Sequence, residues 1–226
     1  MPRFYDDSAL NEGLVLDLIA GPKALGSNGK VLDFSKYHNN GTIAGATWTQ
    51  LSSGLWVLSF DGVDDYVDCG TSLVLNPTTA ITIEAWVKAA TVTTSHQNVV
   101  SKHGADEAFI LRNNTDQKWS FMLYDTSWAD VVADETATAG QWYHLVGTWA
   151  TGQPMLLFVN GQLQADTQAF TGSIHVSARP VVLGQIALKN NSEIFEGQIG
   201  RVRIYNRTLS ASEIAARYHR TKWRYE

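Results

Sequence analysis

Cysteine and long apolar runs are the two features that this sequence most clearly lacks. Cys69 is the only cysteine among the 226 residues, so no disulfide can form within the chain. A single cysteine is more often a small buried apolar residue than a reactive thiol, and we interpret Cys69 in this way. No apolar run approaches the roughly 20 residues that cross a bilayer. In the segment from Met1 to Asn11, Asp6 and Asp7 interrupt the place where a signal peptide needs an apolar stretch. The sequence therefore predicts neither membrane insertion nor an export signal.

Positive charge is also scarce. The chain carries 17 Lys and Arg against 22 Asp and Glu, which gives a formal net charge of -5, and only 17% of its residues are charged. This composition provides no broad basic field that would attract phosphate backbones or anionic lipid headgroups. We therefore expect neither nucleic acid nor a membrane surface as a partner.

The usual catalytic patterns are missing as well. No Gly-rich phosphate loop, zinc-ligand spacing or Ser-His-Asp arrangement can be traced. A retaining glycosidase needs two carboxylates about 5 to 5.5 Å apart, which a strand supplies as acidic residues two positions apart. Glu84 instead stands alone on its predicted strand, whereas Asp106-Glu107 and Asp134-Glu135 are adjacent pairs whose side chains would diverge. We predict that the chain is not an enzyme.

Aromatic residues and glycine are plentiful, with eight each of Trp, Tyr and Phe and 18 Gly. Such a composition is typical of short strands joined by tight turns. Alternation is clearest from Ile81 to Lys88, where one face is apolar and predicts a half-buried strand. Similar runs predict further strands at Val99 to Lys102, Phe109 to Arg112, Trp119 to Tyr124, Tyr143 to Trp149, Met155 to Val159, Val181 to Leu183 and Arg201 to Tyr205. Eight or more strands indicate an all-β protein with two stacked sheets.

The turn and helix signals are specific. Asn160-Gly161 between two apolar pairs is the strongest hairpin signal in the chain. At the C-terminal end, Ser210 followed by Glu213 forms a capping box that predicts a helix from Ala211 to about His219. The basic and aromatic tail from Arg220 to Glu226 can fray, pack back on a sheet or contact a partner subunit.

Six segments in this order resemble the laminin-G-like, concanavalin A-like lectin/glucanase jelly-roll family. They are Asp33 to Ser35 with Asn39 to Thr42, Ser59 to Val67, Ile81 to Lys88, Gln141 to Trp149, Leu157 to Gly161, and Ile204 to Ser210 followed by Glu213-Ile214. The resemblance implies a two-sheet antiparallel jelly-roll sandwich with a short C-terminal helix. We expect one domain over residues 1–226, with its core at about 13–219.

Proteins of this family include carbohydrate-binding modules, adhesion domains, pentraxin-like recognition proteins and surface or virion components, many of which bind calcium. A shared fold does not determine a shared activity. This chain also departs from the family, because Gly200 and Arg201 stand where relatives usually carry an acidic pair. That departure puts a family-type metal site in doubt.

Two loops nevertheless supply oxygen ligands of the kind that Ca²⁺ prefers. The candidate metal ligands are Asp33, Asn39, Asp61, Asp64 and Asp65. The alternative interpretation is that these side chains cap turns by accepting hydrogen bonds from backbone N–H groups.

Two clusters are candidate ligand-binding residues. If Ile83, Ala85, Val202 and Ile204 point into the core, strict alternation directs Glu84, Trp86 and Arg203 outward, where an aromatic face and charged groups suit a sugar. The alternative is an ordinary Glu84–Arg203 ion pair beside Trp86 and a covering loop. The second cluster, which would line a rim pocket, consists of Lys102, His103, Arg112, Tyr124 and Trp128. His144 is interpreted as a packed, hydrogen-bonded structural histidine.

Two functions follow from these observations. The first is a non-catalytic module that binds carbohydrate, assisted by calcium, with a glycan or a cell or virion surface as its partner. The second is a structural protein, such as a surface-layer, capsid-decoration or fibre component, that forms homo-oligomers. Either role fits an extracellular or virion-surface location better than a cytoplasmic enzyme.

Overall fold

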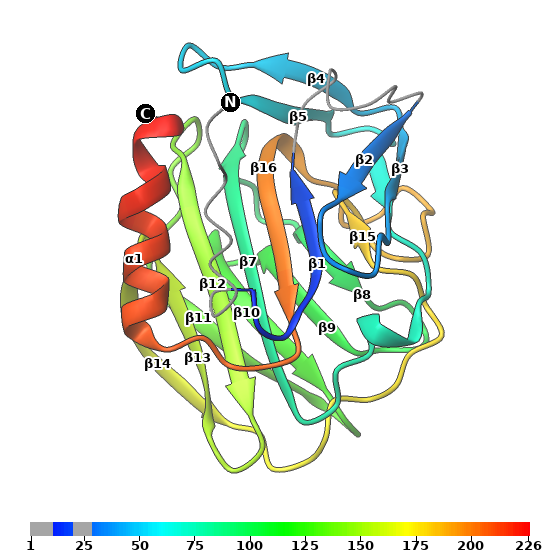
Figure 1. Ribbon diagram of the computed structural model, residues 1–226, viewed down its shortest axis with the longest axis vertical. Coiled ribbons are helices and arrows are strands. Elements are labelled where there is room, and N and C mark those ends of the chain that lie inside the picture. Colours follow the sequence, from blue (N-terminus) through cyan, green and yellow to red (C-terminus); the bar gives the residue numbers. More distant parts are fainter. Residues whose placement is uncertain (1–10, 20–28) are drawn as a thin grey trace.

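The computed structural model describes residues 11–19 and 29–226, so the acidic stretch used in the signal-peptide prediction lies outside it. The described part contains sixteen strands, one α-helix and two short 3₁₀ helices, η1 and η2 (Figure 1). Their bounds are β1 Leu14–Ile19, β2 Lys30–Asp33, β3 Gly41–Ala44, β4 Thr47–Gln50, β5 Trp56–Asp61, β6 Tyr66–Asp68, η1 Leu73–Leu75, β7 Ala80–Ala89, β8 Gln97–Lys102, β9 Phe109–Asn113, β10 Lys118–Tyr124, β11 Trp128–Thr136, β12 Tyr143–Ala150, β13 Pro154–Val159, β14 Gln162–Ala169, β15 Val182–Leu183, β16 Glu196–Tyr205, α1 Ala211–Thr221 and η2 Lys222–Arg224.

The predicted all-β class is confirmed, but the strands do not form two separate sheets. They follow one antiparallel path in the order β11-β10-β9-β8-β15-β6-β3-β2-β1-β16-β7-β12-β13-β14, with β4 and β5 attached at β16. The pairing of β1 with β2, through Leu18 with Asp33 and Ile19 with Leu32, joins the two halves. Figure 1 shows the half around β16, β7 and β12 lying in front of the half around β8, β9 and β10.

The two ends of this path almost close the sheet on itself. Strands β11 and β14 are its terminal strands and lie side by side. Asp166 accepts a hydrogen bond from the backbone N–H of Val132, Gln164 accepts one from Asp134, and the Asp134 carboxylate accepts one from Ala165. Side chains therefore satisfy edge N–H groups that would otherwise be open to pairing with another chain.

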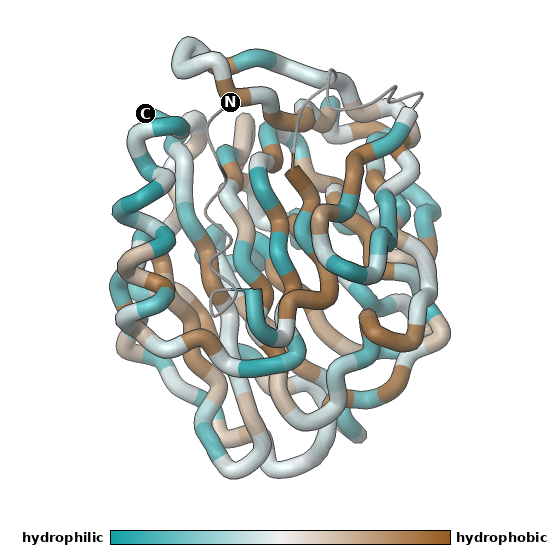
Figure 2. Tube along the Cα trace, viewed as in Figure 1, coloured by the Kyte–Doolittle hydropathy of each residue, from teal (hydrophilic) through white to brown (hydrophobic). Residues whose placement is uncertain are grey.

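The core lies between the two halves, as the alternation predicts. Ile81, Ile83, Ala85 and Val87 all belong to it, together with Val202 and Ile204. Brown and teal segments alternate along several of the strands in Figure 2, as expected for strands with one face in the core. Cys69 is also buried in this core, which confirms its interpretation as a small apolar residue.

The expectation that β7 is half-buried was wrong, because the C-terminal segment covers its other face. Helix α1 begins at the predicted capping box, and Leu209 and Ile214 pack with Tyr205 in a second small cluster. Beyond the helix, Tyr225 packs with Trp86 in a third cluster. Of the three alternatives for the tail, the structure selects packing back on the sheet. Within the described ranges, no helix has the length and apolarity needed to cross a membrane.

Candidate functional site

A pocket of about 340 Å³ lies on the outer face of β9 and β10. Leu111 and Phe121 point into the core, so alternation turns Ile110, Arg112 and Met122 to the opposite face. Three residues of the predicted rim cluster, His103, Arg112 and Trp128, are brought together here. We call this pocket the rim pocket; its lining is completed by His96, Gly104, Ala105, Glu107, Ile186, Leu188 and Glu193.

Charged groups in the rim pocket are arranged around Glu193. Its carboxylate lies 3.1 Å from His103 Nε2 and 3.7 Å from Arg112 Nη1, and it accepts a 2.8 Å hydrogen bond from Asn98 Nδ2. Burial would raise the pKa of Glu193, but the hydrogen bonds and positive charge around it lower that pKa to about 2. On its other side, His103 Nδ1 lies 3.3 Å from Glu107.

Several groups in this pocket retain hydrogen-bonding capacity. His96 Nδ1 and Arg112 Nε are buried and make no hydrogen bond to the described residues. The half-buried Trp128 ring meets His103 edge-on, at 5.9 Å between ring centroids, and completes an apolar wall with Met122 and Leu188. An aromatic wall beside donors and acceptors is chemistry that suits a hydroxyl-rich ligand.

The other two residues of the predicted rim cluster do not line the pocket. Tyr124 contacts Trp128 at 5.2 Å between ring centroids but stands outside the lining. Lys102 is fully buried, and its ammonium group donates to the carbonyl of Arg179. Burial lowers the pKa of Lys102 to about 8. Placing Lys102 at a rim pocket was therefore wrong.

Sequence reasoning missed Glu193, His96 and Glu107. Glu193 follows the polar turn at Asn190-Asn191, more than 80 positions after Arg112, and no spacing links these two residues. The only signal at Glu193 was that turn, which marks a loop without indicating which strands the loop reaches.

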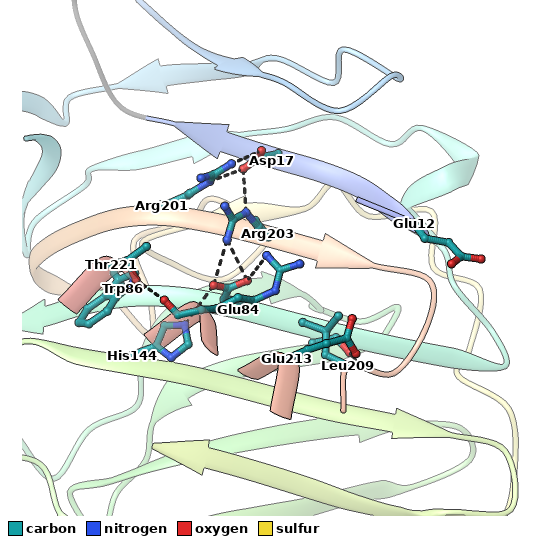
Figure 3. A network of polar contacts seen from close by, with 12 residues as sticks. Glu12, Asp17, Glu84, Trp86, His144, Arg201, Arg203, Leu209, Glu213 and Thr221 are labelled. Carbon is teal, nitrogen blue, oxygen red and sulfur yellow. Dashed lines mark hydrogen bonds and ion pairs between the residues drawn. The ribbon is translucent and has the colours of Figure 1, made fainter. Parts of the chain in front are cut away.

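The other predicted cluster, that of Glu84, Trp86 and Arg203, contains a buried ion-pair network (Figure 3). Arg203 Nη1 on β16 lies 3.1 Å from Glu84 Oε1 on β7, and Arg203 Nε lies 3.3 Å from Asp17 on β1. His144 Nε2 lies 3.0 Å from Glu84, which confirms the structural role expected for this fully buried histidine. Burial would raise the pKa of Glu84, but Arg203, His144 and Arg217 lower it well below its usual value. The ion-pair alternative is thus confirmed.

The open aromatic face expected at Trp86 does not exist. The Trp86 ring stacks on Tyr225 at 4.2 Å between centroids, its Nε1 donates to Thr221, and the residue is only 4% exposed. A narrow pocket of about 200 Å³ remains under this cover, and Glu84, Trp86 and Arg203 contribute to its lining. We call it the tail pocket.

The departure at Gly200 and Arg201 belongs to the same arrangement. A Cβ at Gly200 would lie 2.6 Å from the Tyr225 ring, so glycine leaves the space that the tail occupies. Arg201 donates from Nε and Nη2 to the Asp17 carboxylate, and its backbone N–H donates to the Tyr225 hydroxyl. Gly200 and Arg201 therefore both help the C-terminal tail to pack on the sheet.

The five candidate metal ligands fall into two separate groups. Asp61, Asp64 and Asp65 offer carboxylate oxygens within 4.8 Å of one another. Burial raises the pKa of Asp65, and the charges of Asp61 and Asp64 add to that rise. Asp65 also accepts a hydrogen bond from the backbone of Asp61, and Asp61 accepts one from Val63, as turn-capping side chains do.

Asp33 and Asn39 form their own turn. The Asp33 carboxylate accepts hydrogen bonds from the backbone N–H groups of Asp17, Ser35 and Asn39 and from the Ser35 hydroxyl. These four donors occupy both carboxylate oxygens. The expectation of one five-residue calcium site was wrong for this pair, and the turn-capping alternative accounts for it.

A family described as the concanavalin A-like lectin/glucanases superfamily matches residues 61–215. Pentraxin-related protein PTX3 of Mus musculus is 34% identical over 97 residues, which span 38% of this chain but only 25% of that protein.

Two solved structures share the fold. Domain 4 of AbnA, an extracellular arabinanase of Geobacillus stearothermophilus in complex with arabinotriose, superposes with a TM-score of 0.70 at 17% identity, covering 90% of this chain and 97% of that domain. The ligand binding domain of botulinum neurotoxin serotype D in complex with N-acetylneuraminic acid gives a TM-score of 0.68 at 16% identity, covering 94% of this chain and 52% of that domain. At these identities the likeness shows the fold alone.

Proposed function

We propose that this chain, which belongs to the concanavalin A-like lectin/glucanases superfamily, is a non-catalytic carbohydrate-binding module. The observation that carries the proposal is the rim pocket. There the Trp128 ring stands beside Arg112, His103 and Glu193, and buried nitrogens of His96 and Arg112 retain hydrogen-bonding capacity. An aromatic wall can pack against the C–H face of a sugar ring, while the charged and imidazole groups bond its hydroxyls.

The fold relatives support the same function. The arabinanase domain matches over nearly its whole length and was solved with arabinotriose. The neurotoxin domain was solved with N-acetylneuraminic acid, although this chain spans only about half of it. By charge, the rim pocket favours a neutral sugar, since its lining holds two glutamates and one arginine.

The test is a titration of the purified chain with neutral oligosaccharides, starting from arabinotriose and a glycan array, followed by calorimetry on the strongest binder. We expect Trp128→Ala to weaken binding at least about tenfold, equivalent to about 1.4 kcal/mol. Phe34→Ala is the matched control, because Phe34 is an aromatic residue outside this pocket that is 51% exposed. Binding lost in Phe34→Ala and retained in Trp128→Ala would place the sugar elsewhere, and an absence of glycan binding would refute the function.

Calcium assistance and an extracellular or virion-surface location are further parts of the proposal. The group of Asp61, Asp64 and Asp65 is where calcium would bind, with backbone carbonyls completing the shell. Chelation with EDTA should then lower the melting temperature, and Asp64→Asn should abolish that response. The assembly alternative has less support, because Tyr225 is buried on this chain's own sheet. Light scattering at several concentrations would reveal a homo-oligomer.

A further inference from the structure

We propose that the tail pocket is a second binding site, independent of the rim pocket, for a small sugar acid whose carboxylate meets the guanidinium groups of Arg201 and Arg203. The pocket lies between the C-terminal segment and strands β1, β5, β7 and β16. It is lined by Ile19, Leu55, Trp56, Glu84, Trp86, Arg201, Arg203, Thr221, Arg224 and Tyr225.

The charges around this pocket favour an anion. Among the residues that the structure describes, two carboxylates, those of Asp17 and Glu84, face the three guanidinium groups of the pocket lining, those of Arg201, Arg203 and Arg224, which leaves an excess of one positive charge. The whole chain has a net charge of -5, so this excess is local. It is also opposite in sign to the lining of the rim pocket, where acidic groups outnumber the one arginine.

Part of this positive charge remains available to a ligand. Arg201 uses Nε and Nη2 to bind Asp17, and none of the hydrogen bonds in the described chain involves its Nη1. Its side chain is 29% exposed, so a ligand can reach it. Arg224, at the edge of the tail pocket, forms no ion pair with the residues that the structure describes. Its backbone carbonyl accepts a hydrogen bond from the Ser53 hydroxyl. A hydrogen bond between one of these guanidinium groups and a ligand carboxylate would be charge-assisted, and such bonds are stronger than those between neutral groups.

The walls of the tail pocket limit the ligand to a compact body. Ile19, Leu55 and Trp56 form an apolar side, and the pocket volume is about 200 Å³. Trp86 is a wall rather than a stacking platform, because Tyr225 covers it at 4.2 Å and His144 lies at 5.0 Å. Apolar walls lower the local dielectric constant and strengthen the attraction between a carboxylate and Arg201. A single sugar ring carrying a carboxylate fits these limits better than a long chain.

Calorimetric titration with glucuronate, glucose and acetate tests this proposal. We expect glucuronate to bind at least about tenfold more tightly than glucose, which is neutral, and than acetate, which lacks the ring. Arg201→Gln should weaken the binding of glucuronate at least about tenfold. Arg224→Gln, at an exposed position, should weaken that binding by a smaller factor. Lys30→Gln, which removes one positive charge at an exposed position on β2, should leave the affinity unchanged.

Two further measurements test the tail pocket independently of the stability of Arg201→Gln. In NMR spectra, glucuronate should shift the indole N–H signal of Trp56, assigned with Trp56→Phe, even if Arg201→Gln proves unstable. Trp128→Ala should bind glucuronate normally, so failure of the rim pocket and failure of the tail pocket are distinguishable. Equal affinity for glucuronate and glucose or acetate, an unmoved Trp56 signal, or unchanged glucuronate binding in Arg224→Gln together with folded Arg201→Gln would overturn the proposal.

Discussion

Glu84 is the residue on which the covered face of the sheet most depends. Its side chain is 3% exposed and is surrounded by Arg203, His144 and Arg217, at 3.1, 3.0 and 3.7 Å. Desolvating a carboxylate is costly, and only this ring of positive and hydrogen-bonding partners makes its burial tolerable. The same geometry fixes Arg203 between Glu84 and Asp17, which positions one wall of the tail pocket.

Replacing this carboxylate by an amide should therefore destabilise the protein strongly. We expect Glu84→Gln to lower the free energy of unfolding by about 3 kcal/mol, because the buried guanidinium group of Arg203 loses one of its two carboxylate partners. Denaturant unfolding followed by circular dichroism measures the change. Lys189→Gln is the control, since it breaks the partly exposed Lys189–Asp68 pair and should cost less than about 1 kcal/mol. Equal losses in the two variants would contradict the importance assigned to burial.

Glu193 makes the stability of the fold depend on pH. The direction of that dependence follows from its lowered pKa. The folded pKa is about 2 and lies below the ordinary value of 4.5, so ionised Glu193 stabilises the fold above about pH 4.5. That contribution, about 3 kcal/mol, is lost as the pH falls from 4.5 towards 2. Glu193→Gln lacks it, so the stability of wild type should fall more steeply than that of the variant over this window. Parallel curves of unfolding free energy against pH would show that Glu193 is not stabilised by its neighbours.

At the scale of elements, the capping box connects a local sequence signal to the cover of the sheet. Ser210 accepts a hydrogen bond from the Glu213 backbone, and Glu213 accepts one from the Ser210 backbone. Arg207 lies 2.7 Å from Glu213 and, with the Ser210 bonds, lowers the pKa of Glu213 to about 2. These contacts start α1 where Ile214 and Arg217 can reach the sheet.

Removing the cap should loosen this cover. We expect Ser210→Ala to destabilise the protein by about 1 kcal/mol, the usual loss for a serine cap. Ser212→Ala, two positions further along the chain and exposed, removes only a hydroxyl–hydroxyl contact with Ser210 and should cost less than about 0.5 kcal/mol. Both are measured by denaturant unfolding, with the indole N–H NMR signal of Trp86, assigned with Trp86→Phe, as a local probe of the tail. If Ser210→Ala leaves the free energy of unfolding unchanged, tertiary contacts alone determine where the helix begins.

At the scale of the whole molecule, the two halves of the sheet meet where a side chain is absent. A Cβ on Gly147 of β12 would collide with the ring of Phe121 on β10. Both residues are buried within their strands, so neither side has room to move. The close approach of the halves thus depends on glycine at this position.

We expect Gly147→Ala to lower the melting temperature and to cost about 1 to 3 kcal/mol, because overpacking forces strain into a close-packed core. The double variant Gly147→Ala with Phe121→Leu should recover part of that loss, since leucine has no ring at the contact. Thermal unfolding of the wild type, both single variants and the double variant measures the coupling. Simple additivity would show that Gly147 and Phe121 do not constrain each other.

The sequence by itself determined the all-β class, the positions of the predicted strands, the Asn160-Gly161 hairpin and the C-terminal helix. The structure agrees with these because alternation, turn residues and caps act over a few neighbouring positions. The helix extends to Thr221 rather than ending near His219, and Asn160 and Gly161 have positive φ angles of 52° and 76° as a tight hairpin requires. Both predicted ligand clusters also lie at pockets, although not every member does.

Only the tertiary structure decided what covers each face and which distant charges meet. Alternation predicts that Trp86 leaves the core, but it cannot predict that Tyr225, 139 positions later, will stack on it. In the same way, Lys102 is buried and Glu193 enters the rim pocket because of strands and loops far away in sequence. Local patterns determine the direction of a side chain relative to its own strand, whereas its partners depend on long-range packing. The physical reason is that burial and charge pairing are properties of the assembled surface, to which residues remote in the chain contribute equally.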